Sequence, residues 1–133
     1  MGLGSLTPAG DEAIHEIRRP EQLVRRGPRH LTKIVLFPVR FLFTAATGRV
    51  GTNHAAAHHY LAADGAPGAG LVAAALTWRI APPDDPRAAA ELLGRELIAL
   101  YLHYIDDHTA RLTALGQVDL AAAFVRWRDL LVA

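Results

Sequence analysis

The sequence predicts an all-α protein, a bundle of five to six helices in mostly up-down order with one long helix. Apolar residues recur every three to four positions in almost every segment, which is the spacing of an amphipathic helix. Clusters of Gly and Pro separate these segments, and no run alternates apolar and polar residues as a half-buried strand would. A chain of 133 residues with 51% apolar content is expected to form one helical domain over residues 1–133.

The first helical segment is predicted over about residues 11–26. Ile14 and Ile17 lie on one face of it, and Pro20 is expected to split or kink it because proline removes a helical hydrogen-bond donor. Residues 1–10 lack this pattern, and we expect them to be loose. They also lack the basic head and apolar middle of a signal peptide.

The second segment, residues 31–47, is the most apolar part of the chain. Its apolar residues repeat every three to four positions, with a kink expected at Pro38 and with Gly48 suited to the left-handed position after a helix. Lys33 and Arg40 interrupt the segment, so a membrane span is not expected. We therefore expect a soluble, cytoplasmic protein without a membrane partner.

Capping residues predict where the later helices begin. Thr52 or Asn53 can cap a third helix, and residues 71–80 form a short fourth one. Asp85 followed by proline is a strong start signal for a long helix over about residues 86–115.

Two apolar stripes are predicted to build the core from the C-terminal half of the chain. Asp119 is expected to cap the last helix, so that the apolar residues after it share one face. The side chains expected to point inward are Leu93, Leu97, Leu100, Tyr104 and Leu115 in the long helix and Phe124, Trp127 and Leu131 in the last helix.

Composition excludes several kinds of chemistry. The chain has no Cys, which excludes disulfides, thiol catalysis and thiolate zinc sites. Ser5 is the only serine, so a Ser-His-Asp triad is not expected. Charge is distributed unevenly along the chain. Residues 1–60 contain eight Lys/Arg and four Asp/Glu, whereas residues 61–133 contain six Lys/Arg and nine Asp/Glu. The basic half could attract phosphate, a nucleotide or RNA, or it could form a solvated face paired with acidic neighbours.

The histidines offer a candidate metal site. His54 and His58 lie four residues apart, and His103 and Asp107 repeat this spacing on the long helix. Two facing helices that each present such a pair could hold a metal ion with nitrogen and oxygen ligands. The alternative, which we prefer, is that these are exposed or hydrogen-bonded side chains on Ala-rich helices.

One stretch resembles a known family. Residues 31–50, continuing into residues 53–57, resemble the C-terminal helical domain of aminoglycoside nucleotidyltransferases of the streptomycin/spectinomycin adenylyltransferase type. In that family a similar signature runs from the end of one helix into the next: Arg-aromatic-Thr-x-x-Thr-Gly-basic-aliphatic. The residues that carry the resemblance are Arg40, Phe43, Thr44, Thr47, Gly48, Arg49 and Val50.

The resemblance implies a binding role without catalysis. In that family a separate catalytic domain holds a Gly-Ser motif and the carboxylates that bind magnesium, and the helical domain closes over nucleotide and drug. This sequence has no Gly-Ser followed by Asp-x-Asp, so we expect the helical half alone, standalone or truncated, which does not transfer a nucleotide by itself. ATP and magnesium are implied only with the missing catalytic domain, and none is expected in this chain. A catalytic domain or subunit, or a second copy of the chain, is the expected partner.

The resemblance also implies which residues touch the ligands. Asn53 and Trp78 stand where family members carry a phosphate-contacting Lys and a nucleotide-contacting Tyr. The adjacent acids Asp106 and Asp107 would suit a polycationic drug. The full set implied for nucleotide or substrate binding is Arg40, Arg49, Asn53, Trp78, Asp106 and Asp107.

Two further functions are alternatives. The helical architecture of that nucleotidyltransferase domain resembles the higher eukaryote and prokaryote nucleotide-binding (HEPN) family. Some HEPN members are ribonucleases with an Arg-x(4–6)-His motif. Arg49 and His54 match this spacing, which allows a HEPN-like ribonuclease or toxin with His54 as general base and Arg49 steadying the anionic transition state. Nucleic acid is an expected partner only in this alternative. The other alternative is a non-enzymatic helical interaction domain, and whether the chain is an enzyme stays open.

Overall fold

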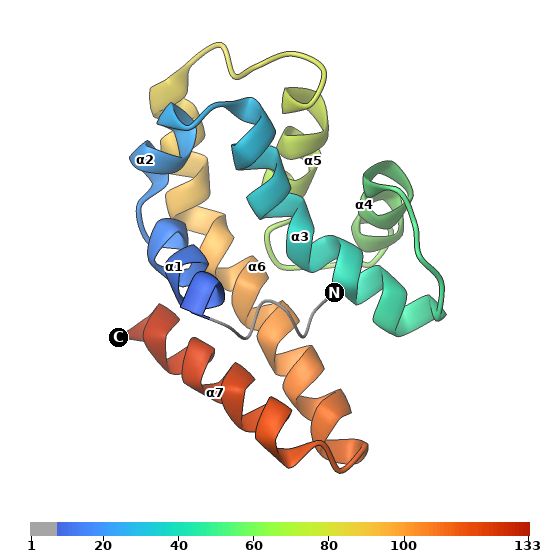
Figure 1. The fold of residues 1–133 in the computed structure, drawn as a ribbon. Coiled ribbons are helices and arrows are strands. Elements are labelled where there is room, and N and C mark those ends of the chain that lie inside the picture. The colour runs from blue at the N-terminus through green and yellow to red at the C-terminus, as the bar shows by residue number, and fades with distance from the viewer. Residues whose placement is uncertain (1–7) are drawn as a thin grey trace.

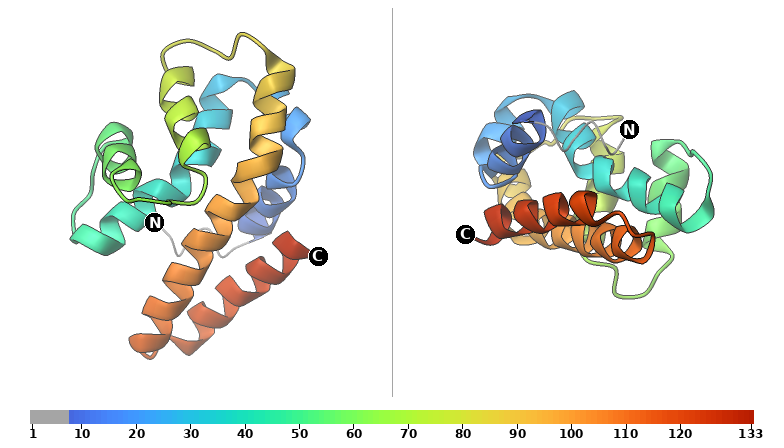
Figure 2. Two further views of the ribbon diagram at one scale, coloured as in Figure 1. Left: turned by 180° about the vertical axis from the view of Figure 1, so that it is seen from behind. Right: turned by 60° about the horizontal axis from the view of Figure 1, so that its bottom comes forward.

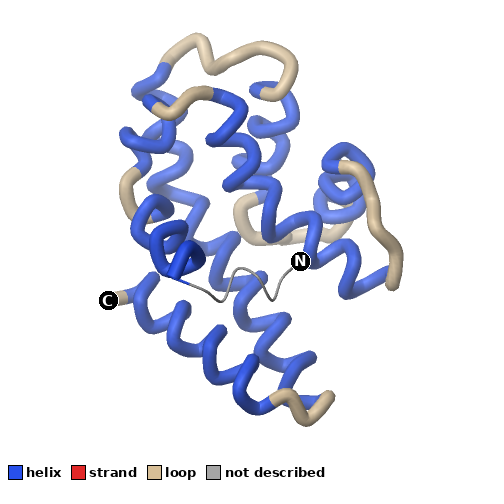
Figure 3. Tube along the Cα trace, viewed as in Figure 1, coloured by secondary structure: helices blue, strands red, loops and turns tan. Residues whose placement is uncertain are grey.

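The computed structural model describes residues 8–133, with side chains from Glu12 onward. These residues form seven α-helices joined by loops and turns, and no strand is present among them (Figures 1 and 3). The predicted all-α class is confirmed. The helices are α1 (Pro8–Ile17), α2 (Pro20–Arg25), α3 (Pro28–Thr47), α4 (Asn53–Leu61), α5 (Ala69–Trp78), α6 (Pro86–Ala114) and α7 (Val118–Val132).

The described part has more helices than the predicted five to six because Pro20 separates α1 from α2. This proline is the first residue of α2, where its missing N–H is harmless because first-turn amides have no helical acceptor. Residues 8–10, which were expected to be loose, belong to α1. The rest of the segment expected to be loose lies outside the described residues.

The capping predictions are confirmed at two helices and wrong at a third. The carboxylate of Asp85 accepts two backbone amides of the first turn of α6, and Thr52, not Asn53, caps α4. Asp119 does not cap α7, because the helix begins at Val118 with Gln117 at the N-cap position, two residues before Asp119. Asp119 therefore lies in the first turn, where its negative charge still complements the helix dipole.

The long helix α6 is the central element of the fold. It packs against α2, α3, α5 and α7, and α7 runs back along its C-terminal half (Figures 1 and 2). The outlying helix α4 packs against α3 and α5 on the far side of the bundle from α7. None of the described helices combines the length and the apolarity that crossing a bilayer requires.

The core forms around the apolar stripe of α6. Of the side chains predicted to face inward, all are buried except Leu115, which is 73% exposed. That prediction was wrong because α6 ends at Ala114, so the stripe stops one residue short of Leu115. The buried members are Leu93, Leu97, Leu100, Tyr104, Phe124, Trp127 and Leu131.

A proline in the middle of α3 is compensated by a side chain from α6. Pro38 has no N–H, so it cannot donate the helical hydrogen bond that the carbonyl of Ile34 would otherwise accept. The hydroxyl of Tyr101 donates to that carbonyl instead, at 2.6 Å. Burial raises the pKa of Tyr101 well above its usual range, which keeps the hydroxyl protonated as a donor. This bond ties the middle of α3 to α6.

Two helix ends are capped by side chains from distant helices. Glu96 of α6 accepts a hydrogen bond from the backbone N–H of Leu71 in the first turn of α5, at 2.9 Å. Arg18, just after α1, donates to the backbone oxygens of Leu130 (3.1 Å) and Ala133 (2.6 Å) at the end of α7. The helix dipole favours both contacts, because negative Glu96 lies at the N-terminus of α5 and positive Arg18 lies at the C-terminus of α7. They connect α5 to α6 and the first helix to the last.

Candidate functional site

A cavity of about 530 Å³ opens along the outward face of α3, and we call it the basic pocket. At 100° per residue, its α3 residues fall within about 120° of one another around the helix, so they share one face of it. The α3–α4 connection and the end of α5 complete the walls. The lining residues are Arg29, Lys33, Phe37, Arg40, Phe41, Thr44, Val50, Gly51, Asn53 and Arg79.

The described lining of the basic pocket is cationic. Four of its side chains, Arg29, Lys33, Arg40 and Arg79, carry positive charge, and none is an Asp or Glu. All four are exposed, and none pairs with a carboxylate in the part of the chain that the structure describes. Like charges around a concave, partly apolar surface reinforce one another's potential, so the pocket attracts anions.

Two aromatic rings form the apolar wall of the basic pocket. Phe37 and Phe41 lie one helical turn apart, with ring centroids 4.8 Å apart. Behind them, Phe37 contacts Tyr104 edge-on at 5.9 Å, and Phe41 lies 6.5 Å from the ring of His108. Because both rings are packed against the core, they present a supported apolar surface that a flat group such as a nucleobase can contact.

The resemblance signature forms the turn that shapes this pocket. The hydroxyl of Thr47 donates to the carbonyl of Phe43 (2.8 Å) and accepts the backbone N–H of Arg49 (3.2 Å). Gly48 adopts the predicted left-handed conformation, with φ of 73°. At Gly51 a Cβ atom would come 2.5 Å from the Phe43 ring, so a side chain does not fit there. Because residue 51 is a glycine, the connection between α3 and α4 can pass closely over the end of α3 and line the pocket.

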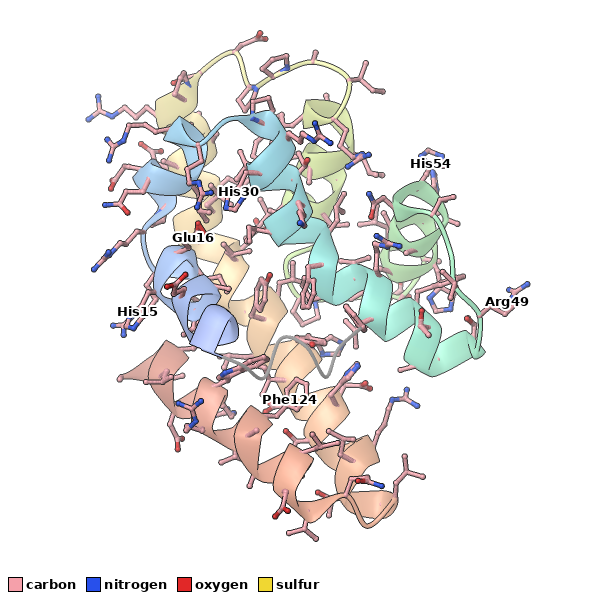
Figure 4. The ribbon with its side chains drawn as sticks, viewed as in Figure 1. His15, Glu16, His30, Arg49, His54 and Phe124 are labelled. Carbon is pink, nitrogen blue, oxygen red and sulfur yellow. The ribbon has the colours of Figure 1, made fainter. Side chains whose placement is uncertain are left out.

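Arg49 and His54 do not converge. Figure 4 shows Arg49 near the α3 end of the connecting loop and His54 at the start of α4, with their side chains well apart. Both are exposed, and neither is among the lining residues of the basic pocket. A ribonuclease of the kind expected would need both side chains at one phosphate. The observed geometry gives that alternative no support.

The candidate metal ligands lie in two separate places. His54 and His58 are neighbours on the exposed face of α4, with ring centroids 4.2 Å apart. His103 and Asp107 line a smaller cavity of about 310 Å³ between α3, α4 and α6, together with His59. No three His, Asp or Glu side chains of the described chain are grouped closely enough to hold a metal ion, so the candidate quartet is not assembled.

The two acids expected to suit a cationic drug are already paired. Asp106 accepts a hydrogen bond from Arg128 of α7 at 2.9 Å, and Asp107 accepts one from Arg111 at 2.9 Å. Asp107 also lies 3.3 Å from Nδ1 of His108. Neighbours on a helix point about 100° apart, so the two carboxylates face different partners. Neither lines the basic pocket.

His108 lies at the junction of three helices. Its ring is 4.6 Å from Tyr104 of α6 and 5.7 Å from Phe124 of α7, in addition to its contact with Phe41 of α3. Burial lowers the pKa of His108 below its ordinary value of 6.5, and the neighbouring Asp107 offsets this only in part. The ring is therefore neutral at pH 7, behind the aromatic wall of the basic pocket.

The arginine-rich segment of residues 18–30, which runs from the end of α1 into the first turn of α3, serves several purposes. Besides Arg18, which caps α7, Arg26 donates to Glu16 at 2.5 Å. The ring of His30 also hydrogen-bonds Glu16, at 2.9 Å, and thereby connects α1 to α3 (Figure 4). Of the residues in this segment, Arg29 alone is found in the lining of the basic pocket. In this segment Arg18 and Arg26 thus stabilise the fold, whereas Arg29 is available to a ligand.

Of the residues that the resemblance implied for nucleotide or substrate binding, Arg40 and Asn53 lie in the lining of the basic pocket. Arg49 is not in this lining, and Trp78 packs half-buried against the core. Their contact with a ligand stays a prediction. The missed residues Arg29, Lys33 and Phe37 fall at four-residue steps along α3, a signal that a helical projection of this segment contains. No local signal points to Arg79, because tertiary packing alone brings the end of α5 to α3.

Comparison of the chain with protein-family models, with curated proteins and with solved structures finds no match. The relation to aminoglycoside nucleotidyltransferases therefore stays a prediction from residues 31–57.

Proposed function

We propose that the chain is a nucleotide-binding helical domain that acts as the non-catalytic lid of an aminoglycoside-type nucleotidyltransferase, and that the nucleotide occupies the basic pocket. One observation carries the proposal: four cations surround an aromatic wall, and the described lining contains no carboxylate. A nucleotide has the matching parts, because its phosphates are anionic and its base has flat π faces that stack on aromatic rings. The implied ligand residues Arg40 and Asn53 are in this lining.

Each part of a nucleotide has a chemical counterpart in the pocket. Arg and Lys side chains form charge-assisted hydrogen bonds with phosphate oxygens, which are among the stronger hydrogen bonds in proteins. Phe37 and Phe41 offer the surface against which a base packs. The hydroxyl of Thr44 and the amide of Asn53 can hydrogen-bond the sugar or the base edge.

Binding is expected without transfer. Nucleotidyl transfer relies on metal ions held by carboxylates, which neutralise charge on the reacting phosphate. The lining of the basic pocket supplies cations for binding but no such carboxylate. In this proposal a separate catalytic domain or subunit contributes the carboxylates, the magnesium and the reaction.

The drug-binding part of the proposal rests on the resemblance. Asp106 and Asp107 are engaged by Arg128 and Arg111, so a polycationic ligand would compete with an arginine at either carboxylate. The local geometry thus favours the nucleotide as the ligand of this chain. Streptomycin-type drugs remain the expected substrate of the complete enzyme.

Calorimetric titration of the purified chain with ATP at low ionic strength tests the proposal. The variant Arg40→Gln removes a pocket cation, and hydrogen bonds to charged groups contribute about 1.5–3 kcal/mol, so its ATP affinity should fall about tenfold or more. Arg95→Gln is the matched control, because Arg95 is an exposed arginine of α6 that is not among the pocket residues.

Two results would contradict the proposed function. Absence of ATP binding, or equal loss of binding in Arg40→Gln and Arg95→Gln, would show that the basic pocket is not a nucleotide site. Adenylylation of streptomycin by the chain alone would show that it is not merely the lid.

A further inference from the structure

We infer that His54 and His58 form a bidentate site for a divalent late transition-metal ion, and that Cu²⁺ is the ion it binds most tightly. The pair lies on the exposed face of α4, and neither histidine is among the lining residues of the basic pocket. The inference is therefore independent of the proposed function.

The helix brings the two imidazole rings together. Residues four apart on an α-helix differ by about 40° around the axis and by about 6 Å along it. The rings of His54 and His58 accordingly lie side by side, with centroids 4.2 Å apart. Two nitrogen ligands of one ion lie roughly 3 Å apart, because each is about 2.0–2.1 Å from the metal. Rotation about the last side-chain torsion, which is broad for histidine, can bring one nitrogen of each ring to this separation.

Both rings are available to a metal ion. The two side chains are exposed, and in the described part of the chain neither takes part in a hydrogen bond or an ion pair. His54 projects away from the bundle (Figure 4). By contrast, His30 is hydrogen-bonded to Glu16, and His108 is enclosed by aromatic rings. The pair on α4 thus differs from histidines that serve the fold.

The helix that carries the pair is held from its other side. Ala56, Ala57 and Tyr60 are buried, and α4 packs against α3 and α5. The hydroxyl of Tyr60 donates to the carbonyl of Pro67 at 2.5 Å, and Thr52 caps the start of the helix. Because the backbone is fixed before an ion arrives, little chain entropy is lost when the ion binds.

The two nitrogen ligands determine which ions fit. Imidazole suits Cu²⁺, Ni²⁺ and Zn²⁺, whereas Mg²⁺ and Ca²⁺ prefer oxygen ligands. At a given nitrogen site the affinity rises from Co²⁺ through Ni²⁺ to Cu²⁺ and falls again at Zn²⁺. Among the described residues no third His, Asp or Glu joins the pair, so water would fill the other coordination positions.

Calorimetric titration of the intact chain with Cu²⁺ in a weakly coordinating buffer at pH 7.5 is the first test. Wild type should bind one ion at its tightest site. His54→Gln and His58→Gln should each weaken this binding about 100-fold, because a single imidazole lacks its chelating partner. Unchanged affinity in both variants would overturn the inference.

His59→Gln is the matched control for the pair. His59 is an exposed histidine of the same helix, but the residues four positions before and after it are alanines, so it has no partner for chelation. Its substitution should change the Cu²⁺ affinity by less than about twofold. A loss as large as that in His54→Gln would contradict the assigned pair. The melting temperature of each variant shows whether the exposed substitution leaves the fold intact.

The choice of ion and the pH provide a second test. Binding should be tighter for Cu²⁺ than for Ni²⁺ or Zn²⁺, and it should be undetectable for Mg²⁺. Acidification from pH 7.5 to pH 5.5 should weaken Cu²⁺ binding, because protons compete with the metal for the imidazole nitrogens. Tighter binding of Mg²⁺ than of Zn²⁺ would indicate oxygen ligands and contradict the inference.

A ¹H–¹⁵N NMR titration locates the ion. Cu²⁺ is paramagnetic and broadens the signals of nearby amides, so at substoichiometric Cu²⁺ the amides of residues 53–61 should broaden first. Broadening centred on His103 and Asp107 would place the ion elsewhere and overturn the inference. Arg40→Gln should bind Cu²⁺ as wild type does, because Arg40 belongs to the basic pocket and not to the histidine pair.

Discussion

Two charged regions of the molecule are organised in opposite ways. At the α6–α7 surface, Asp106 pairs with Arg128 and Asp107 pairs with Arg111, so positive and negative side chains neutralise each other. In the basic pocket, cations gather without acidic neighbours in the lining. Both regions contain charged residues that sequence reasoning selected. A charged residue therefore becomes a candidate for binding when the fold leaves it unpaired beside a cavity.

Reversing charge in the basic pocket should produce the largest effect. Lys33→Glu combined with Arg40→Glu replaces attraction for phosphate by repulsion, and loss of close charge pairs costs about 2–5 kcal/mol or more, so ATP affinity should fall at least about 100-fold. Calorimetry measures the binding, and thermal unfolding should show an unchanged melting temperature because both side chains are exposed.

The matching change at the α6–α7 surface is the control for this comparison. Asp106→Lys combined with Arg128→Glu exchanges the charges of a paired site that is not part of the basic pocket. ATP affinity should stay within about twofold of wild type, since the exchange keeps the local net charge and exposed charges are screened within about 10 Å. A loss as large as that in the pocket variant would remove the distinction between the two regions.

The helix that carries the basic pocket should depend on Tyr101. Tyr101→Phe leaves the carbonyl of Ile34 without its donor, and an unsatisfied buried polar group costs about 1–3 kcal/mol, so the free energy of unfolding should fall by that amount. Denaturant titration measures it.

A double-mutant cycle isolates the cause of that loss. Pro38→Ala supplies the missing backbone N–H, so Tyr101→Phe should cost markedly less in the Pro38→Ala background than in the wild type. Equal costs in the two backgrounds would refute the idea that the tyrosine substitutes for the proline.

Acidification should lower the free energy of unfolding through His108, which lies behind the aromatic wall of the basic pocket. A histidine whose pKa is lowered by folding takes up its proton more readily when the chain is unfolded. His108 therefore leaves stability unchanged well above its ordinary value of 6.5, and stability falls as the pH drops below that value toward the lowered folded pKa. Unfolding free energies between pH 7.5 and 5.5 should decline more steeply in wild type than in His108→Gln. Parallel profiles would show that His108 is not responsible.

The smallest effect is expected from the paired surface itself. Arg128→Gln removes the exposed ion pair with Asp106, and such pairs contribute about 0.2–1 kcal/mol, less at high salt. Denaturant titration at low and high ionic strength measures this. A loss above about 2 kcal/mol would mean that the pair holds α7 in place, contrary to its exposed position.

Most of the fold could be predicted from local signals, whereas the site could be predicted only in part. Periodicity and the Asp85-Pro start signal indicate the helices because they act within a few residues. The bond from Tyr101 to Ile34 and the cap that Glu96 provides for α5 join positions far apart in the chain, so no local pattern reveals them. For the same reason Arg79 was missed as a pocket residue.

The central claim is tested most directly by a ¹H–¹⁵N NMR titration of the intact chain with ATP. The account predicts that amide shifts change along the outward face of α3 between Arg29 and Thr44, in residues 50–53 and at Arg79, while amides around Asp106 stay unchanged. Shift changes centred on the α6–α7 surface, or no changes at millimolar ATP, would contradict it.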